Sequence, residues 1–343
     1  MIGALTLSSG GGQTAFPGDT YTNPLIFVLT DTQGRALSSF PITLTSVNAT
    51  LSATSATTDS QGRISITAQA GTTTGAATVT ATYLTFSANA SLTVIPRGPS
   101  VTNQSFYNGA SFQVGLSPCS IGTVFGNGLA PNVQGTVNGS QGFGPLPYTL
   151  ANVSISIAGV ATPIVSVSNS NGQQQVSFQT PCEVRPGPST VVVNVGAGST
   201  TVQNVAVNAA QPGIFTYLGP NGKVYGVVQS AADGSYVTPT NLARRGGTYF
   251  MYVTGLGATT PQPQTNAAGV AGQNVANTVL VGINNAGVPV IGAQYAPGLV
   301  GVYYIVFTIP QTSQPGLDQS LVVAEQINGL TIFGNNPLLP GVQ

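Results

Sequence analysis

The chain carries few side chains that could perform acid–base or nucleophilic chemistry. It has 343 residues and no histidine, and its seven acidic and seven basic residues give a formal net charge of zero. Without histidine, Ser-His-Asp and Cys-His arrangements and histidine metal sites are impossible. A glycosidase would need two carboxylates facing each other across a cleft. The carboxylates are Asp19, Asp31, Asp59, Asp233, Asp318, Glu183 and Glu325.

Most of these carboxylates stand in turn-like sequence. Asp31 and Asp59 each begin an Asp-x-x-Gly segment, where aspartate typically bonds the backbone of a turn. A calcium site is the alternative, but it would need about six to eight oxygens from several groups, and each aspartate stands alone. The sequence therefore predicts a protein that is not an enzyme and that holds no metal and no cofactor.

The composition also limits the classes of partner. Charged residues make up 4% of the chain, against about 25% in ordinary soluble proteins. The basic residues are scattered, so the electrostatic term that dominates nucleic-acid binding is missing. Mean hydropathy is +0.25, yet no apolar run reaches the ~18 residues that span a membrane. Outer faces that are polar but uncharged suit repeated contact between copies of one chain.

Residues 1–96 contain a series of short segments that alternate apolar and polar residues. This period of two, with β-branched residues and turn-like sequence between the segments, predicts strands. Their number and spacing are typical of an immunoglobulin-like sandwich. The segments are 25–29, 42–44, 64–66, 77–83 and 90–94.

The same region resembles the bacterial immunoglobulin-like domain of invasins and intimins. Residues 28–37, 57–63 and 75–81 carry the likeness, which covers nearly all of residues 1–96. In that family such domains are rigid spacers of surface proteins, and binding usually resides in other domains. The resemblance therefore implies a surface protein.

Beyond a short linker at 95–99 the sequence repeats itself. Gly126, Phe178 and Pro186 have counterparts in Gly255, Phe307 and Pro315, each 129 residues later. A common offset at three landmarks indicates two copies of one unit. We therefore predict an all-β fold of three tandem immunoglobulin-like β-sandwich domains, at 1–96, 100–210 and 211–343.

Residues 103–330 also resemble an uncharacterised domain found in many secreted acidobacterial proteins. The segments 108–112, 124–130, 212–215 and 296–301 carry this likeness, which implies a secreted protein of no assigned activity. Cys119 and Cys182 stand where that family commonly has glycine and an aromatic residue. Their joint appearance at neighbouring loop ends indicates a disulfide, with free buried thiols or an intermolecular bridge as alternatives.

The tyrosines concentrate in the last predicted domain. Tyrosine often anchors carbohydrate and protein interfaces, but the alternation at 303–307 indicates that about half of these side chains pack the core. They are Tyr225, Tyr236, Tyr249, Tyr252, Tyr295, Tyr303 and Tyr304.

Two non-catalytic roles are compatible with these features. The first is a structural subunit of an extracellular filament or sheath, in which copies of the chain bind one another. The second is an adhesin or carbohydrate-binding module of a larger secreted protein, with surface glycans or a neighbouring cell surface as partner. Location outside the cell is inferred from domain type, because residues 1–5 lack the features of a secretory signal.

For the first role, the two ends of the chain are the candidate assembly elements. A strand carrying Ile2, Leu5 and Leu7 precedes a glycine hinge, and an apolar tail carries Leu338 and Leu339. With one lysine in the chain, sheet edges are poorly guarded against pairing with another chain. We therefore predict that at least one end packs against a neighbouring copy.

Overall fold

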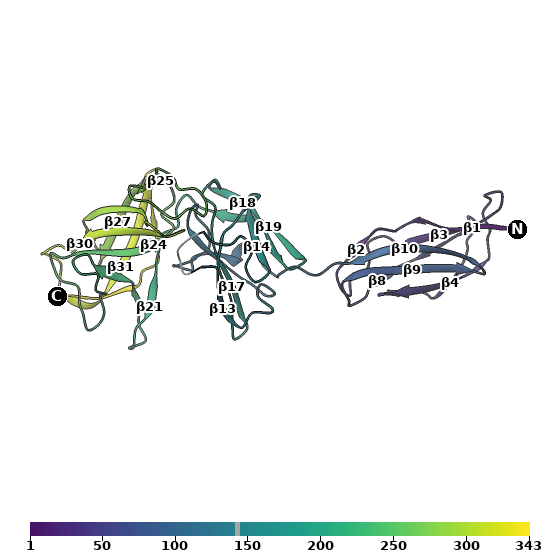
Figure 1. Ribbon diagram of the computed structural model, residues 1–343, viewed down its shortest axis with the longest axis horizontal. Coiled ribbons are helices and arrows are strands. Elements are labelled where there is room, and N and C mark those ends of the chain that lie inside the picture. The colour runs from purple at the N-terminus through teal and green to yellow at the C-terminus, as the bar shows by residue number, and fades with distance from the viewer. Residues whose placement is uncertain (141–144) are drawn as a thin grey trace. The chain divides into compact units, whose positions relative to one another are not determined.

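The computed structural model describes residues 1–140 and 145–343, and it is built of β-strands (Figure 1). The chain forms two compact units, Met1–Arg97 and Gly98–Gln343. Within the described ranges the one helical element is a 3-10 turn, η1 (Asn103–Ser105), and no helix there is long and apolar enough to cross a membrane. The all-β prediction is confirmed.

Unit Met1–Arg97 is a sandwich of two main sheets. One has the order β1-β3-β7, with β1 (Ile2–Ser9), β3 (Leu25–Asp31) and β7 (Arg63–Ile66). The other has the order β2-β10-β9-β4-β6, with β2 (Thr14–Ala15), β10 (Phe86–Val94), β9 (Gly75–Tyr83), β4 (Pro41–Val47) and β6 (Ser55–Thr57). A small ribbon pairs β5 (Ala49–Leu51) with β8 (Ala68–Ala70). In the lettering of immunoglobulin domains, β1, β3 and β7 are strands A, B and E, and β4, β9 and β10 are strands C, F and G. This grouping is that of an immunoglobulin-like sandwich.

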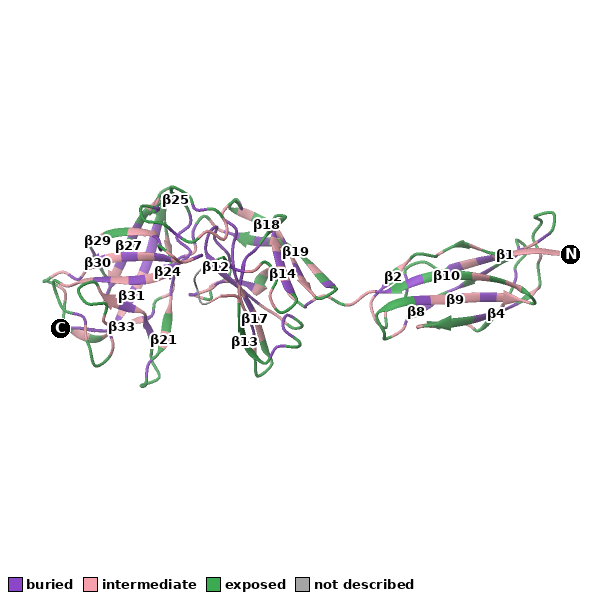
Figure 2. Ribbon diagram, viewed as in Figure 1, coloured by how far each residue is buried: buried purple, intermediate pink, exposed green. Residues whose placement is uncertain are grey.

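Apolar side chains at alternate positions along the strands form the core of this unit. In β3, Leu25, Phe27 and Leu29 are almost fully buried, while the residues between them are only partly covered (Figure 2). β9 and β10 show the same period of two. Successive side chains of a strand point to opposite faces, so each strand contributes one apolar row to the space between the sheets.

The aspartate turns of this unit bond their own backbone. Asp31 Oδ1 accepts hydrogen bonds from the backbone N–H groups of Gln33 and Arg35, each 2.9 Å long, and Asp31 Oδ2 pairs with Arg35 Nε at 2.7 Å. Asp59 accepts equivalent bonds from Gln61 and Arg63. Because the backbone N–H of Arg35, and of Arg63 in the second turn, stabilises the ionised form, the pKa of each carboxyl is lowered.

Unit Gly98–Gln343 contains two pairs of sheets, each pair with its own hydrophobic cluster. The first sheet of the first pair has the order β11-β12-β17-β16-β13, with β11 (Phe106–Asn108), β12 (Ile121–Phe125), β17 (Gln173–Gln179), β16 (Ile164–Ser170) and β13 (Gly135–Asn138). Its partner has the order β15-β14-β18-β19, with β15 (Val160–Ala161), β14 (Val153–Ile157), β18 (Gly187–Val195) and β19 (Gly198–Val207).

The second pair repeats this strand order. One sheet runs β20-β24-β30-β29-β26-β25 with β23 beside β24: β20 (Gly213–Ile214), β24 (Thr248–Thr254), β30 (Tyr303–Thr308), β29 (Val290–Tyr295), β26 (Asn274–Val275), β25 (Thr259–Thr260) and β23 (Val228–Ser230). The other runs β21-β22-β33-β31-β27-β28 with β32 beside β31: β21 (Thr216–Leu218), β22 (Val224–Gly226), β33 (Leu338–Val342), β31 (Gly316–Ile327), β27 (Thr278–Ile283), β28 (Ala286–Val288) and β32 (Leu330–Phe333). Both pairs follow the A-B-E-D and C-F-G order of immunoglobulin-like sandwiches.

A Gly-x-Gly loop follows β12 in the first sandwich and β24 in the second. Each loop lies against the chain segment that leads into its sandwich. A Cβ on Gly126 would lie 2.5 Å from the Ser100 carbonyl oxygen, and one on Gly255 would lie 1.8 Å from the Gln211 carbonyl oxygen. Gly255 also has a φ of +87°. These glycines allow close contact between backbones, as expected of strand-end glycines.

Gly255→Ala is expected to destabilise unit Gly98–Gln343. The left-handed backbone alone costs about 1–2 kcal/mol for an L-residue, and the contact with the Gln211 oxygen adds to that cost. The measurement is the urea unfolding midpoint, with Gly234→Ala as control because it shares the left-handed backbone while its Cβ would meet no atom within 4 Å. Equal midpoints for the two variants would contradict the close-contact interpretation.

Candidate functional site

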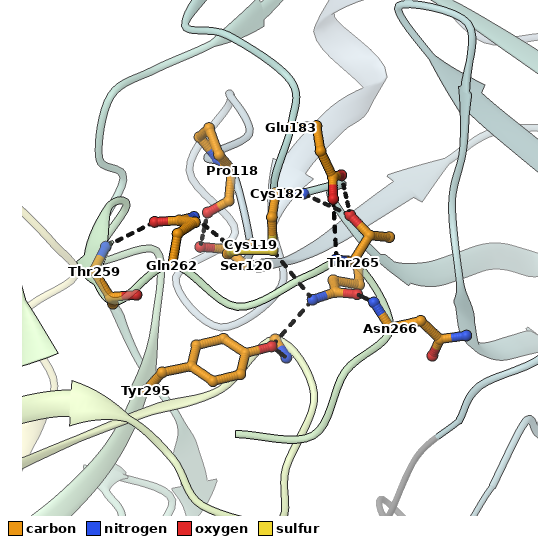
Figure 3. Close-up of a disulfide and its surroundings, with 12 residues drawn as sticks. Pro118, Cys119, Ser120, Cys182, Glu183, Thr259, Gln262, Thr265, Asn266 and Tyr295 are labelled. Carbon is orange, nitrogen blue, oxygen red and sulfur yellow. Dashed lines mark hydrogen bonds between the residues drawn. A yellow bond between two sulfur atoms is a disulfide. The ribbon is translucent and has the colours of Figure 1, made fainter. Parts of the chain in front are cut away.

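Cys119 and Cys182 form a disulfide at the junction between the two sandwiches of unit Gly98–Gln343 (Figure 3). Both residues belong to the first sandwich of this unit, one before β12 and one after β17. Cys119 is fully buried, however, within the hydrophobic cluster that contains Leu256, Tyr295 and Tyr303 of the second sandwich. The bond therefore lies where the core of one sandwich meets the loops of the other.

The loop after β25 holds this junction with hydrogen bonds. Gln262 Nε2 lies 3.0 Å from Cys119 Sγ, and the Cys182 N–H donates to Thr265 Oγ1 at 2.8 Å. The Asn266 N–H donates to Gln179 Oε1 at 2.7 Å, and Gln179 Nε2 donates to Tyr295 Oη at 3.0 Å. Side chains of both sandwiches thus fix their relative placement.

Glu183, beside this disulfide, and Glu325, in β31, lie in contrasting surroundings. Burial opposes ionisation of Glu183, but the bonds it accepts, first from the Thr265 hydroxyl, outweigh it and lower its pKa. Glu325 is 0% exposed, and burial raises its pKa to about 7 against the opposing hydrogen bond from Asn277. Asn277 Nδ2 donates to Glu325 Oε1 at 2.8 Å, while Oε2 is buried without a partner among the described residues.

The strands at both chain ends pair within their own sandwiches. β1 pairs with β3 of its own unit, and β33 pairs with β31 and β22 of its own sandwich. Leu5 is 6% exposed and Leu339 0%. These two side chains close the cores of their own sandwiches.

The remaining members of the predicted assembly set follow the same pattern. Ile2 and Leu7 pack against the core of the first unit, and Leu338 is half-buried in β33. Each terminal strand thus completes a sheet of its own sandwich, and the assembly role of these five residues stays a prediction.

An aromatic surface covers the outer face of β24 and β30. In β24 the inward residues Tyr249, Met251 and Val253 are buried, while Phe250 and Tyr252 are partly exposed. β30 alternates in the same way, with Tyr304 and Val306 outward. Register places Phe250 opposite Val306 and Tyr252 opposite Tyr304, so the outward side chains form one continuous patch.

The patch borders a hollow of about 340 Å³. We call this hollow the aromatic groove. The rings of Phe250 and Tyr252 lie edge to face with centroids 5.8 Å apart, and Gln294 Nε2 donates to Tyr304 Oη. Among the described residues no charged side chain lines the groove, whose residues are Phe250, Tyr252, Ala296, Pro297, Tyr304 and Val306.

Of the seven tyrosines singled out in the sequence, four are buried. Tyr225, Tyr249, Tyr295 and Tyr303 fill the core of the last sandwich, whereas Tyr252 and Tyr304 reach the groove. Phe250 and Pro297 were not anticipated. The signal for Phe250 is present at 248–253, where alternation produces an inward and an outward row that both contain aromatic residues.

A second apolar hollow, of about 350 Å³, lies over the opposite sheet of this sandwich. Leu280 of β27, Ala324 of β31 and Phe333 of β32 lie side by side in register there. Phe333 is 60% exposed and Leu280 is 37% exposed. Both sheets of the last sandwich therefore present apolar side chains outward.

No protein-family model and no curated protein matches this chain. Solved structures with a similar fold include a C-terminal fragment of intimin in complex with the intimin-binding domain of its translocated receptor, at 14% identity over 70% of each chain and a TM-score of 0.33. Invasin, titled a bacterial integrin-binding protein, is 15% identical over 98% of this chain and 60% of its own, with a TM-score of 0.25.

A third similar structure is the Bacteroides ovatus protein SGBP-B in complex with a mixed-linkage heptasaccharide. It is 14% identical over 98% of this chain and 67% of its own, with a TM-score of 0.29. At these TM-scores none of the likenesses carries an argument about what this chain binds. The immunoglobulin-like fold is shown by the strand order of its sheets.

Proposed function

We propose that this chain is an extracellular, non-catalytic adhesin or carbohydrate-binding module whose aromatic groove binds a neutral glycan. The observation that carries the proposal is the outward row of Phe250, Tyr252 and Tyr304 beside a hollow of about 340 Å³. Ligand sites are typically concave and apolar with a few polar groups that orient the ligand.

The chemistry of the groove fits a sugar ring. One face of a pyranose presents C–H groups that pack on an aromatic ring, and its rim presents hydroxyls that need hydrogen-bond partners. Tyr252, Tyr304 and Gln294 offer hydroxyl and amide groups beside the rings. Because no charged side chain lines the groove, a neutral glycan is a better match than an anionic one.

Two features support a location outside the cell. The Cys119–Cys182 disulfide is of a kind that persists in oxidising compartments. The resemblance of residues 1–96 to the invasin-type spacers of surface proteins favours the same location. In this proposal unit Met1–Arg97 is a spacer and unit Gly98–Gln343 carries the binding surface.

A structural subunit of a filament or sheath is the second candidate function. It is favoured by the uncharged apolar face formed by Leu280, Ala324 and Phe333. Burial of this face between copies would remove it from water. Sedimentation of the intact protein separates the two functions, because the adhesin is expected to be a monomer and the subunit an assembly.

Tyr252→Ala/Tyr304→Ala is expected to weaken glycan binding by at least thirtyfold, because removing a buried aromatic anchor typically costs about 2 kcal/mol or more. The measurement is co-sedimentation with insoluble cellulose, chitin and mannan, followed by calorimetric titration with oligosaccharides of whichever polysaccharide binds.

Tyr236→Ala is the matched control, because Tyr236 is 57% exposed on the same sandwich and lies outside the groove. It should bind like the unchanged protein. If the double variant retains full affinity, or if the unchanged protein binds none of the three polysaccharides, the proposal fails.

A further inference from the structure

A second cleft lies between the two sandwiches of unit Gly98–Gln343, away from the aromatic groove. Its volume is about 470 Å³. Phe112, from the loop after β11, forms one wall, and Val224, Pro337 and Leu338 of the other sandwich form the opposite wall. Ligand sites often form where two domains meet.

Phe112 is held at this cleft in an unfavourable backbone conformation. Its φ is +54°, in the left-handed region, and it is the one aromatic residue among the described residues with a positive φ. Its side chain is 54% exposed and its ring contacts the ring of Phe125 with centroids 6.0 Å apart, so only part of the ring is buried to offset the strain. Strained positions of bulky residues concentrate at ligand-binding sites.

The loop around Phe112 is fixed by a buried side chain. Asn108 is 2% exposed, and its Oδ1 accepts hydrogen bonds of 2.8 Å from the backbone N–H groups of Ala110 and Ser111. Its Nδ2 donates to the Gln211 carbonyl oxygen, in the segment that joins the sandwiches. The ring of Phe112 is thus presented by a rigid support.

The cleft is bordered by an open sheet edge. β21 is the terminal strand of its sheet and pairs only with β22. The Gly219 N–H bonds the Lys223 carbonyl oxygen and the Val227 N–H bonds the Phe215 carbonyl oxygen. In this segment, therefore, the backbone N–H and C=O groups of odd-numbered residues face β22. The N–H and C=O groups of Thr216 and Leu218 therefore point to the free edge, where no described residue bonds them.

The residues beside this edge are apolar and carry no net charge. Leu218 is 72% exposed and Val224, opposite it in register, is 48% exposed. In the part of the chain that the structure describes, Lys223 is the one charged group that lines the cleft, and it is paired with Asp318 at 2.6 Å. An extended, uncharged segment with apolar side chains would satisfy the backbone edge and cover these residues together.

We propose that this cleft binds an extended peptide strand of a partner protein, which pairs with β21 and places its apolar side chains against Phe112 and Val224. This site is separate from the aromatic groove. A glycan, a second copy of this chain or no occupant are the alternative outcomes.

The test uses the full chain and a soluble peptide of defined sequence, Gly-Ser-Thr-Val-Thr-Val-Thr-Val-Ser-Gly, blocked at both ends. Binding is measured by calorimetry and by NMR shifts of the unit. Two further peptides carry N-methyl groups on the valines or on the threonines. The backbone N–H groups of either the valines or the threonines can face β21, but not both, and a methyl group there blocks the hydrogen bond. One methylated peptide should therefore bind at least tenfold more weakly than the other.

Protein variants test the two walls. Phe112→Gly, which suits the left-handed backbone, and Thr216→Pro, which removes one outward N–H, should each weaken peptide binding at least tenfold. Leu84→Gly is the control, since Leu84 is also an exposed apolar residue with a positive φ but lies in unit Met1–Arg97. Tyr252→Ala/Tyr304→Ala should leave peptide binding unchanged.

Three results would overturn the proposal. They are no peptide binding at millimolar concentration, equal binding of both methylated peptides, and unchanged binding by the Phe112 and Thr216 variants. A dimer in sedimentation that Thr216→Pro abolishes would replace a partner strand with a second copy as the occupant. Loss of glycan binding alone, with peptide binding intact, would concern the aromatic groove and not this cleft.

Discussion

Replacing both Cys119 and Cys182 with serine is expected to lower the unfolding free energy of unit Gly98–Gln343 by about 4 kcal/mol. The disulfide spans 63 residues, and a cross-link over a loop of this length restricts the unfolded chain strongly. In the folded state Cys119 also packs within the core of the second sandwich of this unit. Loss of the bond should therefore affect both sandwiches.

The measurement is urea unfolding followed by a probe of each unit. Unit Met1–Arg97 contains no cysteine, so its transition serves as an internal control and should not move. Reduced protein of unchanged sequence is the second control, because it opens the bond while keeping both sulfur atoms. A decrease below about 1 kcal/mol would contradict the expected role of the bond.

Hydrogen exchange locates the effect. Residues 259–266 contact the disulfide through Gln262 and Thr265. The serine substitutions should accelerate the exchange of their backbone N–H groups more than that of β14 and β18, which lie in the opposite sheet of the first sandwich. Equal acceleration throughout the unit would indicate a purely global effect of the cross-link.

The fold class was predictable because strand alternation is local. At 303–307 the alternation indicates that about half of the tyrosines face inward, and the structure buries Tyr303 and leaves Tyr304 outward. The turns at Asp31 and Asp59 were predicted in the same way, and each carboxylate bonds the backbone of its own turn. Both predictions depend on residues that are neighbours in the sequence.

The pairing of the chain ends within the chain could not be predicted, because their pattern is ambiguous. An alternating apolar strand reads the same whether it completes its own sheet or one of another copy. Only the space left beside β3, and the pairing of β33 with β31, decide that both ends fold back. That information lies in tertiary packing and not in either terminal segment.

The candidate sites depend on contacts between distant segments. Tyr252 and Tyr304 are 52 residues apart and meet through the register of β24 and β30. The cleft beside Phe112 brings together residues near 112, 224 and 337. Neither arrangement follows from a motif, because register and the placement of the two sandwiches determine them.

The pH dependence of stability should be dominated in one window by Glu325. Its pKa is raised from 4.5 to about 7, first by burial. Below about pH 4.5 the group is protonated in both folded and unfolded chains, and its contribution to stability is fully present. As pH rises towards 7 the unfolded chain ionises more readily, so this contribution is lost.

Glu325→Gln is therefore expected to remove that loss. The glutamine stays neutral at every pH and can still accept the hydrogen bond from Asn277. At pH 8 the variant should be more stable than the unchanged protein by about 3 kcal/mol, since each pKa unit corresponds to about 1.4 kcal/mol. At pH 4 the two should be nearly equal, and calorimetry at both pH values gives the difference.

Asp19→Asn is the matched control for this experiment, because Asp19 is an exposed carboxylate of unit Met1–Arg97, where it pairs with Arg97. It should leave the transition of unit Gly98–Gln343 unchanged at both pH values. If Glu325→Gln instead destabilises the unit equally at pH 4 and pH 8, folding does not raise the pKa of Glu325 and the prediction fails. The buried, unpaired Oε2 argues against that result, because an ionised oxygen without a partner is costly to bury.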